Sequence, residues 1–220
     1  MALTVNAPAP LTGVLPPTDA AIREAARLLR DGHLVIIPTE TVYGVAALAT
    51  SPAAMTRLYA AKGRPPAKPV ARMIASSDAL PAALGTDVPP AARRLAEAFW
   101  PGPLTLVLRG DDGITVGYRV PDHPVALAWL RALGDAVPAV TSANRSGEPA
   151  ATDAAAAWHA LRPHAALALD GGPSRQGQAS TVVQIEGSTL RILREGPIPA
   201  SRIAAVAGRQ PPAHPCCTPP

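Results

Sequence analysis

Cysteines, aromatic residues and long apolar runs are all scarce in this 220-residue chain. Cys216 and Cys217 are adjacent in a proline-rich tail, which excludes a disulfide framework or a metal cluster of recognisable spacing. Aromatic residues make up only 3% of the chain, so surfaces that stack single-stranded RNA are difficult to build. No segment has the roughly 18 to 20 apolar residues that cross a bilayer, and the N-terminus lacks a signal-peptide pattern. We therefore expect a soluble, cytoplasmic protein without membrane contact.

Three common ligand-binding and catalytic motifs are also missing. The chain has no Gly-x-x-x-x-Gly-Lys-Ser/Thr phosphate loop, no Gly-x-Gly-x-x-Gly fingerprint and no Gly-x-Ser-x-Gly turn. Its five histidines show neither metal-ligand spacing nor pairing with a nucleophile. Standard NTPases, dinucleotide-binding enzymes and serine hydrolases lose their main support, and no metal ligand is assigned.

Lysine is scarce too, and its two occurrences are close together. Lys62 and Lys68 lie in residues 62–68, whereas the other eighteen basic residues are scattered arginines. A compact ammonium differs from a guanidinium in hydration and geometry and can follow a moving phosphate. We interpret this segment as a site for an anionic ligand, most simply a nucleoside triphosphate, with chance clustering as the alternative. The net charge of +4 permits polyanion binding but marks no nucleic-acid face.

Helix and strand signals interleave along the chain. Helices are predicted from a cap at Thr18 or Asp19, from residue 52 to 61, over 91–99 and 124–133, from a cap at Thr152 or Asp153, and after residue 199. Strands are predicted over residues 34–37, 70–74, 104–108, 115–120, 138–141 and 167–169, with a hairpin over 180–193. The pattern predicts one α/β domain around a mixed sheet. Its expected bounds are 18–208, between an extended lead-in (1–17) and a disordered tail (209–220).

Two more polar segments interrupt apolar runs. Residues 38–44 are predicted to form a loop at the end of a buried strand, where open α/β sheets bind ligands. Residues 141–147 could cradle an anion, because small hydroxyl and amide side chains let the backbone approach phosphate oxygens; an ordinary turn is the alternative. Glu40 is the only acid in the three polar segments. Its candidate roles are orienting a ligand ammonium, helping to hold Mg2+, capping a helix or lying on the surface.

The same segments occur in an order that resembles a known enzyme family. Residues 38–44, 62–65, 100–105, 119–124 and 141–147 read PTETVYG, KGRP, WPGPLT, RVPDHP and TSANRSG. DGGP at 170–173, STVV at 180–183 and ILREG at 192–196 follow in order. Together they resemble the YrdC-like threonylcarbamoyl-AMP synthases of the short, single-domain type, over about residues 20–197.

The resemblance implies both a fold and a reaction. The fold would be a YrdC-like twisted open mixed sheet flanked by helices. The enzyme would be an ATP-binding nucleotidyltransferase that forms threonylcarbamoyl-AMP and pyrophosphate from L-threonine, bicarbonate and ATP, with Mg2+. A tRNA-modifying transferase complex would receive the product and modify the adenosine next to the anticodon, and weak tRNA or RNA binding would be possible. Positioning and electrostatics would suffice for this chemistry, without a covalent nucleophile.

The resemblance also assigns site residues, which we expect to converge on one cleft. It assigns ATP to Lys62, Arg64, Thr115, Ser142, Asn144 and Arg194. It assigns threonine or its carbamate to Thr39, Lys68, Arg119 and Ser180. Ala179 and Gln184 depart from the family pattern, which usually has acids there, and Arg72 stands where an apolar residue or histidine is usual.

Two other functions stay open. One is a paralogue that uses the same fold for another carbamoyl adenylate or for carbamoyl transfer. The other is a non-catalytic YrdC-like module that binds RNA through a basic concave face, since a positive cleft suits either ligand. ATP consumption that depends on L-threonine would discriminate between them and the synthase.

Overall fold

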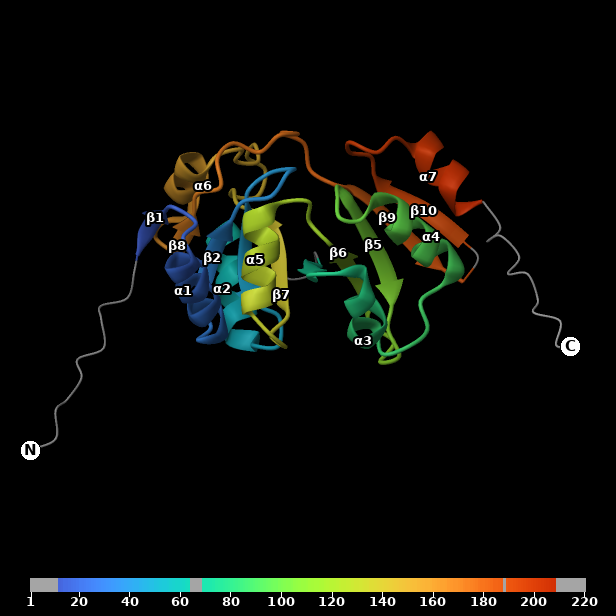
Figure 1. Ribbon diagram of the computed structural model, residues 1–220, viewed down its shortest axis with the longest axis horizontal. Coiled ribbons are helices and arrows are strands. Elements are labelled where there is room, and N and C mark those ends of the chain that lie inside the picture. The colour runs from blue at the N-terminus through green and yellow to red at the C-terminus, as the bar shows by residue number, and fades with distance from the viewer. Residues whose placement is uncertain (1–11, 64–68, 188, 209–220) are drawn as a thin grey trace, which may run out of the picture.

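The computed structural model describes residues 12–63, 69–187 and 189–208, whose strands form a single ten-stranded sheet (Figure 1). The strands are β1 (Gly13–Leu15), β2 (Leu34–Ile37), β3 (Gly44–Leu48), β4 (Ala71–Met73), β5 (Leu104–Arg109), β6 (Thr115–Arg119), β7 (Pro138–Ser142), β8 (Ala165–Leu169), β9 (Thr181–Glu186) and β10 (Thr189–Arg194). Their order is β1-β8-β2-β3-β7-β4-β6-β5-β9-β10, with both parallel and antiparallel pairs. The predicted α/β class and mixed sheet are confirmed.

Helices cover the sheet in three groups (Figure 1). They are α1 (Asp19–Arg30), α2 (Pro52–Lys62), α3 (Leu80–Leu84), α4 (Pro90–Phe99), α5 (Pro124–Ala132), α6 (Ala154–Leu161) and α7 (Ala200–Ala207), with a 3-10 turn at Ser77–Ala79. Helices α1 and α5 share one apolar core with β2 and β8, and α2 and α6 share another on the opposite face of these strands. Helices α3, α4 and α7 pack on β5, β6 and β9. In the described part of the chain, no helix combines the length and apolar character needed to span a membrane.

Local capping explains where several helices begin. The Thr18 hydroxyl accepts a hydrogen bond from the Ala21 amide at 3.2 Å, and the Asp153 carboxylate accepts one from the Ala156 amide at 2.8 Å. These bonds satisfy amides that have no partner inside the helix. They confirm the predicted helix starts and decide between the two candidate caps at each.

The chain joins the sheet earlier than the sequence predicts. Strand β1 lies within residues 1–17, the expected lead-in, and pairs in parallel with β8 from Gly13 opposite Leu167 to Leu15 opposite Leu169. The expected domain start at residue 18 is therefore wrong, because an extended segment of three residues completes the edge of the sheet before Pro16. The predictions made for residues 1–11 and for the tail at 209–220 lie outside the described residues.

Two further elements had no counterpart in the prediction. Strand β3 begins at Gly44, the last residue of the expected loop, and runs antiparallel to both β2 and β7. Its small residues at 46 and 47 give no strand signal, but they are fully buried between helices on both faces. The short helix α3 and the turn before it occupy residues that the sequence analysis left unassigned.

Candidate active site

A cavity of about 740 Å³ lies on the face of β5, β6 and β9 that points away from α3, α4 and α7. Along β5, Leu104, Leu106 and Leu108 enter the apolar core, whereas Thr105 and Val107 line the cavity. This alternation follows from the two-residue period of a strand. The remaining walls come from β4, from the loop between β2 and β3, from the end of β7, and from residues 179–180 and 193–194.

The structure brings most of the predicted site residues to this cavity. Six of the ten line it: Thr39, Thr115, Arg119, Ser142, Ser180 and Arg194. Lys62 and Asn144 lie behind its wall, where they are bonded to each other. Arg64 and Lys68 lie outside the described residues, so their assignments stay predictions.

Lys62 is the last residue of α2 and is almost fully buried, at 2% exposure. Its Nζ donates hydrogen bonds to the carbonyl oxygens of Ser142 (2.5 Å) and Asn144 (2.7 Å) and to Asn144 Oδ1 (3.3 Å). The Asn144 side chain in turn donates from Nδ2 to the carbonyls of Arg145 and Glu148. Lys62 therefore fixes the chain at the end of β7 and in the loop after it. The sequence analysis had instead interpreted the Lys62 ammonium as a mobile group that follows a phosphate, and it did not anticipate this bracing role.

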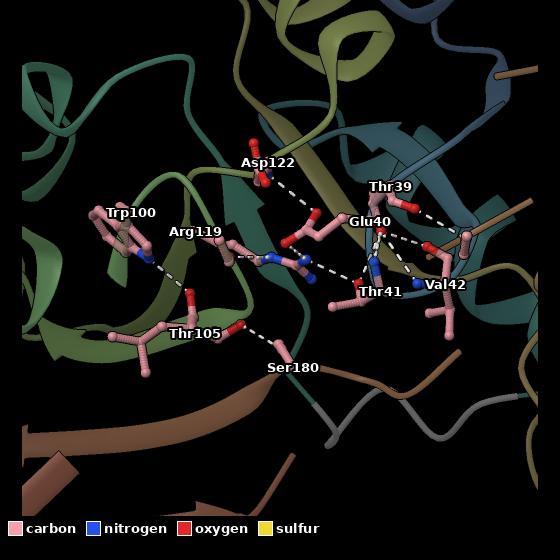
Figure 2. Close-up of polar contacts among 12 residues, drawn as sticks. Thr39, Glu40, Thr41, Val42, Trp100, Thr105, Arg119, Asp122 and Ser180 are labelled. Carbon is pink, nitrogen blue, oxygen red and sulfur yellow. Dashed lines mark hydrogen bonds and ion pairs between the residues drawn. The ribbon is translucent and has the colours of Figure 1, made fainter. Parts of the chain in front are cut away.

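Arg119 and Glu40 form an ion pair beside the cavity (Figure 2). Arg119 Nη2 donates to Glu40 Oε1 at 2.7 Å and to the Thr41 hydroxyl at 2.8 Å, while its Nε donates to the Gly102 carbonyl at 3.2 Å. The other carboxylate oxygen of Glu40 accepts a hydrogen bond from the Asp122 amide at 3.1 Å. Glu40 is 1% exposed, which excludes a surface role, and its side chain caps none of the helices in the described residues.

The Thr39 hydroxyl organises the loop that carries Glu40. It donates to the Val42 carbonyl at 2.6 Å, lies 2.8 Å from the Thr41 hydroxyl, and accepts from the amides of Thr41 and Val42 at 3.3 Å each. Such hydroxyl-to-backbone bonds fix a tight turn. Thr39 consequently shapes the cavity wall as well as lining it.

Thr105 is a cavity residue that the sequence analysis missed. Its hydroxyl lies 2.8 Å from the Ser180 hydroxyl (Figure 2), which also accepts from Arg194 Nη2 at 3.2 Å. Arg194 Nε donates to the Ser180 carbonyl at 3.0 Å. Thr105 was part of a quoted motif, but only the parallel pairing of β5 with β9 brings it next to Ser180.

Residues 170–179, which we call the strap, connect β8 to β9 across the loop that carries Thr39 and Glu40 (Figure 1). Ser174 Oγ donates to the Thr39 carbonyl and the Gln176 amide donates to the Glu40 carbonyl, both at 2.9 Å. Tyr43 also holds the strap, because its hydroxyl donates to the carbonyl of Gly172 at 2.7 Å. Burial is the main cause that raises the pKa of Tyr43 to about 12.

His123 lies under the start of the strap, where a Cβ on Gly171 would lie 2.6 Å from its ring. Burial lowers the pKa of His123, against the opposing effect of the nearby Glu40 carboxylate. Its Nδ1 is buried and has no hydrogen-bond partner among the residues that the structure describes. The ring therefore packs closely against the start of the strap.

The cavity is cationic in the described residues. Arg119 and Arg194 line it, and no aspartate or glutamate does; Ala179 and Gln184, which replace the acids usual in the family, both belong to the lining. No group of three or more histidine, cysteine, aspartate or glutamate side chains suited to a metal occurs in the described residues, and both Glu40 oxygens are bonded within the protein. These residues fit an anionic ligand but do not form a protein-held Mg2+ site.

Comparisons with known proteins agree with the motif pattern. The profile of the Sua5/YciO/YrdC family, described as "Telomere recombination", matches residues 27–196. A Mycobacterium tuberculosis H37Rv protein, provisionally named threonylcarbamoyl-AMP synthase, is 42% identical over 85% of this chain and 89% of its own length. The Bacillus subtilis threonylcarbamoyl-AMP synthase is 40% identical over 90% of this chain and 60% of its own length.

Solved structures give the same relationship. Pyrococcus abyssi Sua5 in complex with L-threonine superposes with a TM-score of 0.79 at 38% identity, over 85% of this chain and 57% of that one. Escherichia coli YciO superposes with a TM-score of 0.76 at 23% identity, over 88% of this chain and all of that one, a likeness of fold. By profile, sequence and fold, this chain belongs to the Sua5/YciO/YrdC family.

Proposed function

We propose that this chain is a threonylcarbamoyl-AMP synthase, a nucleotidyltransferase that uses L-threonine, bicarbonate and ATP. The observation that carries the proposal is one cavity lined by both predicted sets of residues. Thr39, Arg119 and Ser180 come from the set assigned to threonine, and Thr115, Ser142 and Arg194 come from the set assigned to ATP. Relatives bearing this activity in their names, at 39–42% identity, support the same assignment.

Arg119 is suited to hold the carboxylate of the amino acid. Its Nε and Nη2 are bonded within the protein, and among the described contacts its Nη1 makes no hydrogen bond. Because Arg119 lines the cavity, Nη1 can donate to a ligand oxygen there. Ser180 and Thr39 line the same space, where the Ser180 hydroxyl would contact the threonine amine or side chain and Thr39 would shape the wall against which threonine lies.

The part of the cavity lined by the residues assigned to ATP, which we call the ATP end, contains different side chains. Arg194 supplies a guanidinium, and Ser142 lies where Lys62 fixes the backbone after β7. In the proposed reaction the threonine amine bonds to the carbon of bicarbonate, which loses water, or to that of CO2, with release of the amine proton, to give a carbamate. A carbamate oxygen then forms a bond to the α-phosphorus of ATP as the bond to pyrophosphate breaks. Fixed cations and donors would offset the charge that develops on the phosphates.

Mg2+ would arrive with ATP, since the described residues do not hold it, and no step here depends on it. The product is an activated carbamoyl adenylate, which a transferase complex would consume when it modifies tRNA. Because tRNA is the final acceptor, we place the enzyme in the cytoplasm. Weak tRNA or RNA binding stays part of the proposal.

Pyrophosphate release tests the function. The purified chain with ATP, Mg2+ and bicarbonate should release pyrophosphate with L-threonine, and much less with L-serine or without an amino acid. Arg194→Ala should raise the KM for ATP, whereas Arg191→Ala, an exposed arginine of the same strand outside the cavity lining, should not. ATP binding without release for any amino acid would instead favour the carbamoyl-transfer or RNA-binding alternatives.

A further inference from the structure

Glu40 combines full burial with a charge that the reaction itself does not require. Its side chain is 1% exposed, and the paired Arg119 side chain is 7% exposed. Removing both charges from water is costly, and a buried ion pair often stabilises a fold no better than apolar residues would. Stability alone therefore explains this pair poorly, and the geometry of Arg119 supplies a better reason.

Three protein oxygens fix the guanidinium of Arg119. Glu40 Oε1 and the Thr41 hydroxyl both accept from Nη2, and the Gly102 carbonyl accepts from Nε. The planar group is thus held along one edge, which leaves Nη1 to the cavity side. Glu40 contributes the only charged acceptor of the three, and bonds to charged groups are the stronger ones.

Glu40 is itself held on several sides. Its second oxygen accepts from the Asp122 amide, which fixes the carboxylate to the chain just after β6, the strand that carries Arg119. The strap holds its backbone, since the Gln176 amide donates to the Glu40 carbonyl. A carboxylate held this way cannot turn to follow the guanidinium, so it sets the orientation of Arg119.

We propose that Glu40 is a positioning residue that orients Arg119 for the carboxylate of the amino-acid substrate. The inference rests on the proposed function, because it takes Arg119 as the group that meets this carboxylate. It assigns Glu40 a role at the amino-acid end of the cavity only. The ATP end, with Ser142 and Arg194, should not depend on it.

The test compares substrate-specific kinetics of Glu40→Gln with those of the unaltered protein. Glutamine keeps the size of the side chain but removes the charged acceptor, so the KM for L-threonine should rise about tenfold or more. The KM for ATP should stay within about twofold, because the two sites do not share this contact. Glu24→Gln, which removes a carboxylate from an ion pair on the surface of α1, is the matched control and should change neither value.

A double-mutant cycle separates positioning from general support of the fold. In an Arg119→Lys background the fork geometry is already lost, so adding Glu40→Gln should raise the threonine KM little further. An unchanged threonine KM in Glu40→Gln, or an equal loss for both substrates, overturns the inference. If Glu40→Gln does not fold, Glu40→Asp replaces it, and the same two results count against the inference. An unaltered protein without threonine-dependent release refutes the proposed function first, and the inference with it.

Discussion

Buried charged side chains near the cavity form hydrogen bonds with partners that are distant in sequence. Lys62 reaches Ser142, 80 positions away, and Arg119 reaches Glu40, 79 positions away. The motifs contain these residues, and six of the ten residues assigned to ligands line the cavity. The partnerships could not be predicted from one sequence, because they depend on which strands become neighbours.

Replacing Lys62 should cost stability as well as activity. Lys62→Met keeps the aliphatic stem but leaves the buried carbonyl of Asn144 and the half-buried carbonyl of Ser142 without this donor. We expect the free energy of unfolding to fall by about 2 kcal/mol or more, measured by urea denaturation. Arg27→Met, in an exposed ion pair of α1, is the control and should leave the midpoint nearly unchanged. A fully stable Lys62→Met would show that the brace contributes nothing to the fold.

His123 should make the protein sensitive to mild acid. Burial holds its pKa below the usual 6.5, so below pH 6.5 the unfolded chain binds a proton that the folded chain binds less well. Stability is therefore highest above this value and falls as the pH decreases through it. His123→Gln should flatten the decrease in Tm between about pH 7 and pH 5. His159→Gln, an exposed histidine on α6, should keep the full decrease.

At the scale of the elements, the strap is a connecting segment that bonds to a second connection, the loop between β2 and β3. It joins β8 to β9 and holds the carbonyls of Thr39 and Glu40, so it fixes the loop between β2 and β3. Strands with long apolar runs and helices with clear caps were predictable, because both signals are local. The strap, β1 and β3 were not, because their residues gain structure mainly from neighbours that are remote in sequence.

Tyr43 links the strap to the sheet and should respond to alkaline pH. Its pKa is raised from 10.0 to about 12, so between these values the unfolded chain has lost a proton that the folded chain retains. Stability conferred by the neutral hydroxyl is present below pH 10 and lost as the pH rises through about 12. Tyr43→Phe should lower Tm at neutral pH, through loss of the bond to Gly172, and weaken the alkaline decrease. Tyr59→Phe, on α2, is the comparison; identical pH profiles for both variants and the parent would contradict this role.

At the scale of the whole molecule, one continuous sheet joins the cores on both sides of the cavity. The ten strands run from β1 at one edge to β10 at the other (Figure 1). The cavity lies over β4, β6, β5 and β9. The α/β class and the alternation of elements were predictable from periodicity and turn residues. The strand order was not, because six of the nine neighbouring pairs join strands that are not consecutive along the chain.

The edge strand β1 should contribute measurably to global stability. A chain that begins at Thr18 lacks β1, so the outer backbone groups of β8 lose their partners and become an open sheet edge. Its Tm should be lower than that of a chain beginning at Thr12, which keeps β1, and it should associate more readily at high concentration. Calorimetry and light scattering measure the two effects. If the two truncated chains have the same Tm and associate equally, residues 13–15 add nothing to stability and act only as a lead-in.

The alternation along β5, β6 and β9 also has a consequence for protein engineering. On these strands, neighbouring positions face either the apolar core or the cavity, but not both. A combinatorial library restricted to Thr105, Val107, Val182 and Gln184 would vary the ligand-facing surface while leaving the core side chains intact. New substrate preferences should therefore be selectable in this scaffold at little cost in folding yield.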